Sequence, residues 1–339
     1  MSKKFFYLFF TVCICLTLSF YTYFKVSGSS QIKILSFDGG GVRGTASLEI
    51  LKIIQKDTEI DCHKHFDIFA GTSTGSIIAV LLACGMEIEE LSKQYEKMSV
   101  HVFENKVLDL FEPKYDPHPL KESLIQLLQS CGFNEHSLLK DIPKKVVITT
   151  VCLNDPKLKR SSLKFRENIS DQGGNIKIID ALMESTAAPL YFPSYEGYVD
   201  GGIGMKDPSL AALMCAYDPK KHNLKDFSVL SIGTGFQERV ITGATDWGIA
   251  EWLIRLSKES NSVTPFITML MDVGGQIPVQ ACSKLLGESY IKVDFPLNEN
   301  YPLDDYKDLD NLVSYTEYLI VHNPKSWKSV CQWVESNIK

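Results

Sequence analysis

The chain has no long run of lysine or arginine, and its 339 residues carry a formal net charge of −6. Nucleic-acid-binding domains present clustered basic residues, and anionic membranes attract polybasic segments. We therefore expect no nucleic-acid partner and no polybasic contact with anionic lipid. The sequence also gives no sign of an obligatory protein partner.

Metal-binding patterns are missing as well. The nine cysteines are scattered without a C-x-x-C pair, and the seven histidines show no metal spacing. Seven cysteines lie outside the N-terminal apolar run: Cys62, Cys84, Cys131, Cys152, Cys215, Cys282 and Cys331. An odd number argues against a complete disulfide framework, so we expect buried thiols that pack as small apolar side chains.

The N-terminus is the most apolar part of the chain. Lys3 and Lys4 precede an almost unbroken apolar run from Phe5 to Phe24. A basic start followed by such a run is typical of an export signal, and about 20 apolar residues also suffice to span a bilayer. Residues 1–28 are therefore predicted to be either a cleaved signal peptide or a membrane anchor, which would leave the rest of the protein exported or anchored.

After Ser30, segments of strand and helix character alternate. Strands are predicted at 31–37, 65–70, 145–153, 162–166, 227–232 and 289–295. Helices are predicted at 46–54, 77–84, 120–131 and 178–187, and they dominate after residue 246. Residues 100–119 look irregular and suggest a surface loop or a lid. This alternation predicts an α/β fold, a three-layer sandwich around a mainly parallel central sheet.

A serine lies at one of the predicted strand-to-helix turns. Ser73 is flanked two residues away by Gly71 and Gly75. This spacing is the nucleophile-elbow pattern, in which a sharp turn presents a serine at the amino end of a helix. The pentapeptide alone also fits an ordinary tight turn built from small residues.

The segment Asp38–Gly44 reads D-G-G-G-V-R-G. The successive glycines Gly39, Gly40 and Gly41 let several backbone N–H groups converge on an anion, such as the oxyanion of acyl transfer. The spacing is not that of a P-loop, and it fits a dinucleotide-binding turn only loosely. Arg43 could neutralise a phosphate or form a structural ion pair, and Asp38 is expected to brace the loop by hydrogen bonding.

A carboxylate completes the set of candidate catalytic groups. Asp200 follows a short apolar stretch and precedes Gly201 and Gly202, which places it at a predicted strand end on a flexible turn. A serine nucleophile needs a base, and a carboxylate can serve as one. An aspartate in a turn is common, so Asp200 indicates a catalytic role only in combination with the two glycine motifs.

Taken together, these motifs resemble the patatin-like phospholipases, which pair D-G-G-G-x-[RK]-G with G-x-S-x-G and D-G-[GA]. The segments 187–193 (AAPLYFP) and 230–235 (LSIGTG) resemble further parts of that family. The resemblance implies a patatin-like catalytic domain over residues 31–300, with 301–339 as a helical extension packed on it. It also implies acyl hydrolysis of a membrane phospholipid or another acyl lipid, of the phospholipase A or lysophospholipase type, without metal or other cofactor.

The resemblance also assigns roles to residues. Ser73 would attack the ester and Asp200 would act as base, while the backbone around Gly39, Gly40 and Gly41, with Arg43 nearby, would hold the oxyanion. Six further motif positions would support them: Asp38, Gly44, Gly71, Gly75, Gly201 and Gly202.

Two positions depart from the family pattern. Ser76 replaces the usual second glycine after the nucleophile motif, and Lys206-Asp207 precedes Pro208 where the family often has asparagine. Two alternatives stay open. One is an α/β-hydrolase triad in the chain order Ser73, Asp200, His322. The other is a catalytically inactive, membrane-anchored lipid-binding protein of the same fold.

Overall fold

The computed structural model describes residues 31–107, 111–237, 241, 244–253 and 265–339. Residues 1–28, predicted to be a signal peptide or an anchor, lie outside this range. Within the described part, no helix combines the length and apolar character needed to cross a bilayer. Ile32–Lys339 forms one compact unit.

The seven described strands form one mixed sheet in the order β4-β3-β2-β1-β6-β7, with β5 paired to β3. Their bounds are β1 Ile32–Phe37, β2 Ile68–Thr72, β3 Lys145–Asp155, β4 Arg160–Glu167, β5 Tyr198–Asp200, β6 Phe227–Ile232 and β7 Tyr290–Val293. The pairs among β3, β2, β1, β6 and β7 are parallel, whereas β4 and β5 are antiparallel to β3. The prediction of a mainly parallel sheet is thus confirmed.

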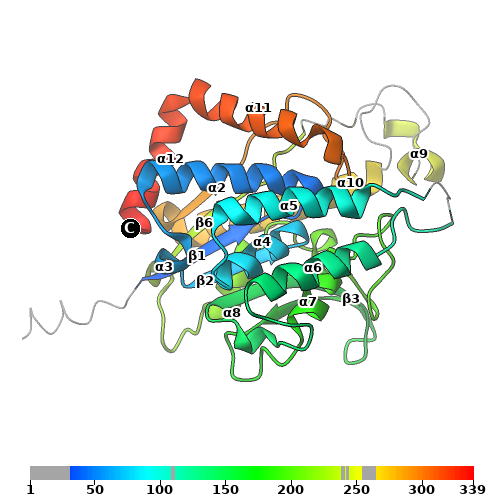
Figure 1. The fold of residues 1–339 in the computed structure, drawn as a ribbon, viewed down its shortest axis with the longest axis horizontal. Helices are drawn as coiled ribbons and strands as arrows, with labels where there is room; N and C mark the ends of the chain where they lie inside the picture. The colour runs from blue at the N-terminus through cyan, green and yellow to red at the C-terminus, as the bar shows by residue number, and fades with distance from the viewer. Residues whose placement is uncertain (1–30, 108–110, 238–240, 242–243, 254–264) are drawn as a thin grey trace, which may run out of the picture. The chain divides into compact units, whose positions relative to one another are not determined.

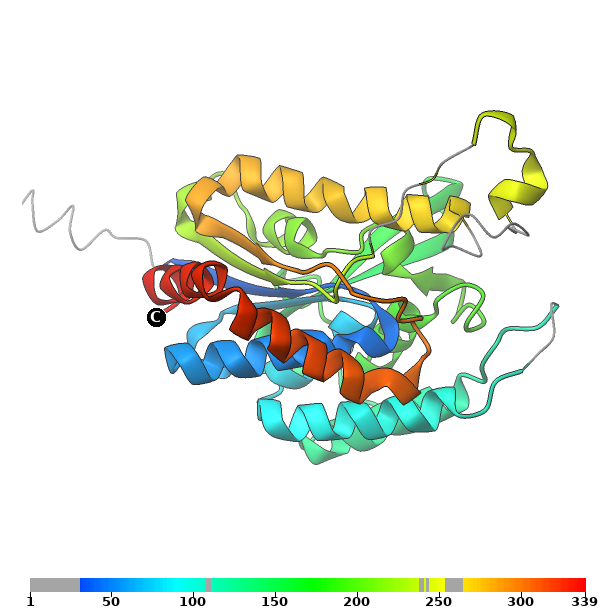
Figure 2. The same cartoon turned by 90° about the horizontal axis from the view of Figure 1, so that it is seen from above.

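Helices cover both faces of the sheet (Figures 1 and 2). One face carries α8 (Ser209–Ala216) and α10 (Pro265–Leu286). On the other side lie α2 (Gly44–Thr58), α4 (Thr74–Ala83), α5 (Ile88–Phe103), α6 (His118–Ser130), α7 (Ile178–Thr186), α11 (Leu309–His322) and α12 (Pro324–Asn337). The short helices are α3 (Cys62–His65) and α9 (Ile249–Leu253). This is the predicted α/β three-layer arrangement.

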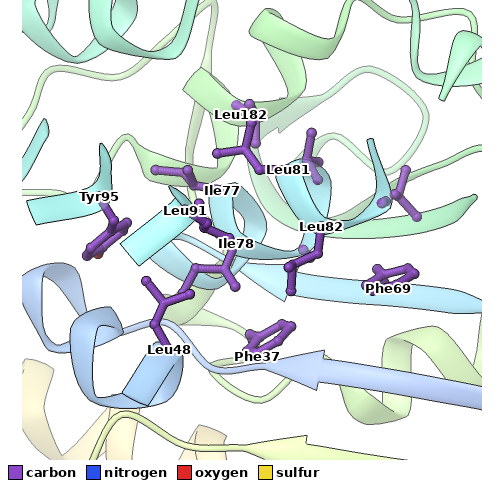
Figure 3. Close-up of a cluster of buried hydrophobic side chains, with 14 of the residues drawn as sticks. Phe37, Leu48, Phe69, Ile77, Ile78, Leu81, Leu82, Leu91, Tyr95 and Leu182 are labelled. Atoms are coloured by element: carbon purple, nitrogen blue, oxygen red, sulfur yellow. The ribbon is translucent and has the colours of Figure 1, made fainter. Parts of the chain in front are cut away.

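Alternation along the strands divides the core between the two faces. In β1, Ile34 packs with the α8 side, whereas Leu35 and Phe37 pack with the α4 side. Figure 3 shows the larger cluster, in which Phe37 and Phe69 from the strands meet apolar side chains from the helices. Every residue of α4 is buried, so the helix that follows Ser73 is fixed by packing along its whole length.

Two predicted elements differ from the structure. The strand predicted at 65–70 starts later, because His65 ends α3 and β2 begins only at Ile68. The reason is local, since the Asp61 carboxylate caps α3 by accepting from the backbone N–H of Lys64. Residues 100–119 are also less irregular than expected, because α5 continues to Phe103 and α6 begins at His118.

Candidate active site

The turn between β2 and α4 places Ser73 in a strained backbone conformation, with φ 54° and ψ −124°. A non-glycine residue there costs about 1–3 kcal/mol, and such strain is concentrated at functional sites. Gly71 and Gly75 make the turn possible, because a β-carbon on either would lie 2.2 Å from a backbone oxygen. The Ser73 side chain makes no capping hydrogen bond to α4, so its hydroxyl is free for another partner.

That partner is the carboxylate of Asp200, at the end of β5. The Ser73 hydroxyl lies close enough to hydrogen-bond with it. Asp200 Oδ1 also accepts from the backbone N–H of Gly202 at 2.7 Å. Burial raises the pKa of the Asp200 carboxyl to about 6, although both hydrogen bonds lower it. A carboxylate of this basicity is ionised at neutral pH and is a stronger base than an exposed aspartate.

Asp200 is held in place by the neighbouring strand. Its backbone N–H donates to the carbonyl of Ala187 at 3.0 Å, and β5 pairs with β3 through Thr150 and Asp200. Gly201 must be glycine, because a β-carbon would lie 2.2 Å from Oγ1 of Thr149. The strand pairing and the glycine together aim the carboxylate at Ser73.

The glycine loop after β1 passes directly beside the serine. A β-carbon on Gly39 would lie 3.2 Å from the β-carbon of Ser73. Gly40 is packed against Thr234, and Gly41 has φ +56° and faces the carbonyl of Leu303. The loop thus approaches Ser73 with bare backbone, as an oxyanion-binding segment requires.

The hydrogen bonds of this loop refine the sequence prediction. The N–H of Gly39 already donates to the carbonyl of Lys206 at 3.1 Å, so it is not available to an oxyanion. Among the described residues, none accepts a hydrogen bond from the N–H of Gly40 or Gly41. The predicted set of Gly39, Gly40 and Gly41 therefore reduces to the last two as candidate donors.

Comparison with known proteins agrees with this geometry. A sequence model of the patatin-like phospholipase family matches residues 35–213, which is more than half of the chain. The chain belongs to the patatin-like phospholipase family. Membership supports phospholipid hydrolysis as its activity.

Similarity to individual proteins extends beyond residues 35–213. Protein teg of Priestia megaterium is 25% identical over 333 residues, which cover 91% of this chain and 99% of that protein. A cGAMP-activated phospholipase of Vibrio cholerae is 30% identical over 271 residues, 68% of this chain and 75% of that protein. Calcium-independent phospholipase A2-gamma of Mus musculus is 26% identical over 325 residues, 89% of this chain and 40% of that protein.

Within this patatin-like site, Arg43 contacts the loop itself. It is buried in a short 3₁₀ turn (Gly41–Arg43), and its Nε lies 3.4 Å from the carbonyl oxygen of Gly40, a long hydrogen bond. The Gly40 carbonyl and the Gly41 N–H belong to one peptide group. A cation at that carbonyl oxygen polarises the peptide group so that its N–H becomes a better donor. Arg43 therefore supports the loop from the carbonyl side.

The remaining motif residues shape the loop and its surroundings. Asp38 forms an ion pair with Lys292 on β7. Gly44 leaves room for Thr74 and Tyr95, because a β-carbon there would lie 2.7 Å from both side-chain oxygens. The N–H of Ser73 donates to Ser185 Oγ at 2.9 Å. Neither Ser185 nor Lys292 belongs to a motif, and sequence analysis missed both.

His322 is not brought to the serine. Its Nδ1 lies 2.8 Å from the carbonyl oxygen of Tyr318, and its ring stacks on the Tyr318 ring at 3.8 Å. The junction of α11 and α12, where His322 lies, is at the end of the domain where β1 begins (Figure 1). Ser73 follows the opposite, carboxyl end of the parallel strands, so the geometry does not support the triad with His322.

Proposed function

We propose that this protein is a serine acyl hydrolase that cleaves fatty acyl esters of phospholipids or lysophospholipids through a Ser73–Asp200 dyad. The observation that carries the proposal is that the hydroxyl of the strained Ser73 lies close enough to the buried carboxylate of Asp200 to hydrogen-bond with it. Such a pair provides a nucleophile and its base in direct contact. A protein of this fold that only bound lipid would not need this pair.

The proposed reaction has two halves. Asp200 accepts the hydroxyl proton as Ser73 Oγ attacks the ester carbonyl, and the N–H groups of Gly40 and Gly41 bind the resulting oxyanion. Collapse breaks the bond to the alcohol, which leaves with the proton from Asp200, and an acyl-serine remains. Asp200 then deprotonates a water molecule that attacks this ester, and the fatty acid leaves as Ser73 recovers its proton.

The surroundings of the dyad suit an apolar substrate. α10 packs against the 3₁₀ turn Gly201–Ile203 that follows Asp200. Its outer face exposes four large apolar side chains at helical spacing, namely Phe266, Leu270, Val273 and Ile277, each more than 40% exposed. Ile203 and Leu190 are exposed as well. Apolar surface next to the dyad can receive an acyl chain as it leaves a membrane.

Acyl release from mixed-acyl phospholipid vesicles tests the proposal. Wild type should release fatty acid, and Ser73→Ala and Asp200→Asn should each lose about 10³-fold or more, as expected for loss of a nucleophile or its base. The fatty acid released identifies the position cleaved. His322→Ala should retain activity. Fatty acid release that persists in Ser73→Ala would refute the proposal.

A further inference from the structure

A lysine outside every motif lies at the centre of a charged cluster beside the site. Lys292, on β7, has a side chain only 14% exposed. Its ammonium group contacts the Asp38 carboxylate, Asp207 Oδ2 at 2.9 Å and Ser231 Oγ at 3.1 Å. An ammonium group has three N–H donors, so these three acceptors satisfy it completely.

The two carboxylates belong to the two segments that must cooperate in acyl transfer. Asp38 directly precedes the glycine loop, and Asp207 lies at the end of the turn that begins with Asp200. The two segments also meet through the backbone, where the Gly39 N–H donates to the Lys206 carbonyl. Lys292 therefore joins the oxyanion loop to the segment that carries the base.

The same segment is anchored to the nucleophile's strand. Thr72 Oγ1 donates to the carbonyl of Met205 at 2.9 Å. At the other end of this segment, Asp207 Oδ1 accepts from the Ser209 N–H at 2.8 Å, and Asp207 Oδ2 accepts from the Ser231 hydroxyl at 2.9 Å. A displacement of residues 205–207 would thus be passed to Ser73's strand and to the glycine loop together.

Lys292 stays charged in this position. Burial alone would lower its pKa, but the carboxylates of Asp207 and Asp38 outweigh burial and raise it. Burial raises the pKa of Asp38 to about 7 even though Lys292 opposes this. Without Lys292 both aspartates would be buried without an ion-pair partner, a costly arrangement that the loop could relieve by moving.

We propose that Lys292 is a positioning residue of the acyl-transfer site, which holds the oxyanion loop and the Asp200 turn in register through Asp38 and Asp207. The proposal rests on the function proposed above. Catalysis depends on donors that are fixed before the charge develops, so a small displacement of Gly40 and Gly41 should lower kcat. Lys292 contacts neither Ser73 nor Asp200 and takes part in no chemical step of the proposed reaction.

The central test compares Lys292→Met with Lys164→Met in the full chain. Lys164 likewise pairs with a buried carboxylate, that of Asp155 at the β3–β4 hairpin, and so controls for the loss of a buried ion pair. On a soluble p-nitrophenyl ester, Lys292→Met should lower kcat about 10²-fold, comparable to loss of an oxyanion donor, with KM within about threefold. Lys164→Met should keep kcat within about twofold while losing thermal stability.

A second variant separates positioning from stability. Lys292→Met combined with Asp207→Asn removes one of the two unpaired carboxylates, and the side-chain oxygen of the introduced asparagine can still accept from the Ser209 N–H. Thermal stability should therefore recover, while kcat stays low because no ion pair joins Asp38 to the Asp200 turn. Lys292→Arg, which keeps a cation, should retain more activity than Lys292→Met. Recovery of kcat in step with stability in the double variant would overturn the proposal.

A covalent probe keeps this test apart from the test of lipid hydrolysis. The rate at which a fluorophosphonate labels Ser73 depends on the nucleophile and the oxyanion donors but not on the lipid. Labelling should slow about 10²-fold in Lys292→Met even if wild type hydrolyses no phospholipid. Equal labelling rates in wild type and Lys292→Met, or no labelling of Ser73 in wild type, would overturn the positioning role.

Discussion

Replacing Asp200, the proposed base, should make the protein more stable as it abolishes the proposed activity. Asp200 has an ordinary pKa of 3.8, and burial raises it to about 6 in the folded protein. A carboxyl group with a raised pKa binds its proton more tightly when folded, so its contribution to stability declines as pH rises from about 4 to about 6. Above that range the difference corresponds to about 3 kcal/mol.

Asparagine removes this penalty because it stays neutral. Its side-chain oxygen can still accept from the Gly202 N–H, and its amide can donate to Ser73. Asp200→Asn should therefore raise the free energy of unfolding by up to about 3 kcal/mol at pH 8 and by little at pH 4. Asp38, whose pKa is raised to about 7, is present in both proteins, so to a first approximation its titration cancels in the difference.

Urea unfolding of wild type and Asp200→Asn at several pH values measures this difference. Asp171→Asn is a matched control, because it removes the same formal charge from an exposed position and should leave stability within about 0.5 kcal/mol. A stability gain in Asp200→Asn that does not depend on pH, or a loss at pH 8, would refute the reasoning that the buried carboxylate is held at a cost for catalysis.

Three further predictions follow from the same geometry. The kcat/KM for a soluble ester should fall below a midpoint near pH 6, because protonated Asp200 cannot accept the serine's proton; a flat profile between about pH 5 and 8 would contradict this role. Gly40→Ala should lower kcat at least about 10²-fold, because its β-carbon has no room in the loop, whereas Gly274→Ala, with no atom closer than 3.9 Å, should not. Leu270→Glu should lower hydrolysis of vesicles about tenfold or more but spare a soluble ester, because it places a charge on the apolar face of α10. The control Gln276→Glu should lower vesicle hydrolysis less. Equal losses on both substrates in Leu270→Glu would refute the lipid-contact role.

Much of the site could be predicted because its motifs report local backbone requirements. Gly71 and Gly75 are needed by the turn around Ser73 itself, and Gly201 by the turn after Asp200. Backbone requirements of this kind can be recognised in a few consecutive residues. The order of strand and helix segments likewise predicted the parallel core of the sheet, since β1, β2 and β6 are each followed by helices that return the chain to the next parallel strand.

Other features depend on contacts between distant parts of the chain. The place of Lys292 beside Asp38 follows from the strand order β1-β6-β7, which periodicity does not specify. The Gly39 N–H is bonded to the Lys206 carbonyl because the segment after β5 returns to the end of β1. The strand predicted at 65–70 was wrong at its start because a single capping aspartate, Asp61, competes with β propensity. Domain boundaries and the fate of residues 1–28 stay predictions.

The most direct measurement is the mass of the protein during turnover of a phospholipid that carries two different acyl chains. After acid quench, wild type should show an increase equal to one of the two acyl groups, and the modified peptide should map to Ser73. No adduct should form in Ser73→Ala. An acyl adduct on another residue, or fatty acid release by Ser73→Ala, would contradict the claim that Ser73 and Asp200 form the catalytic dyad.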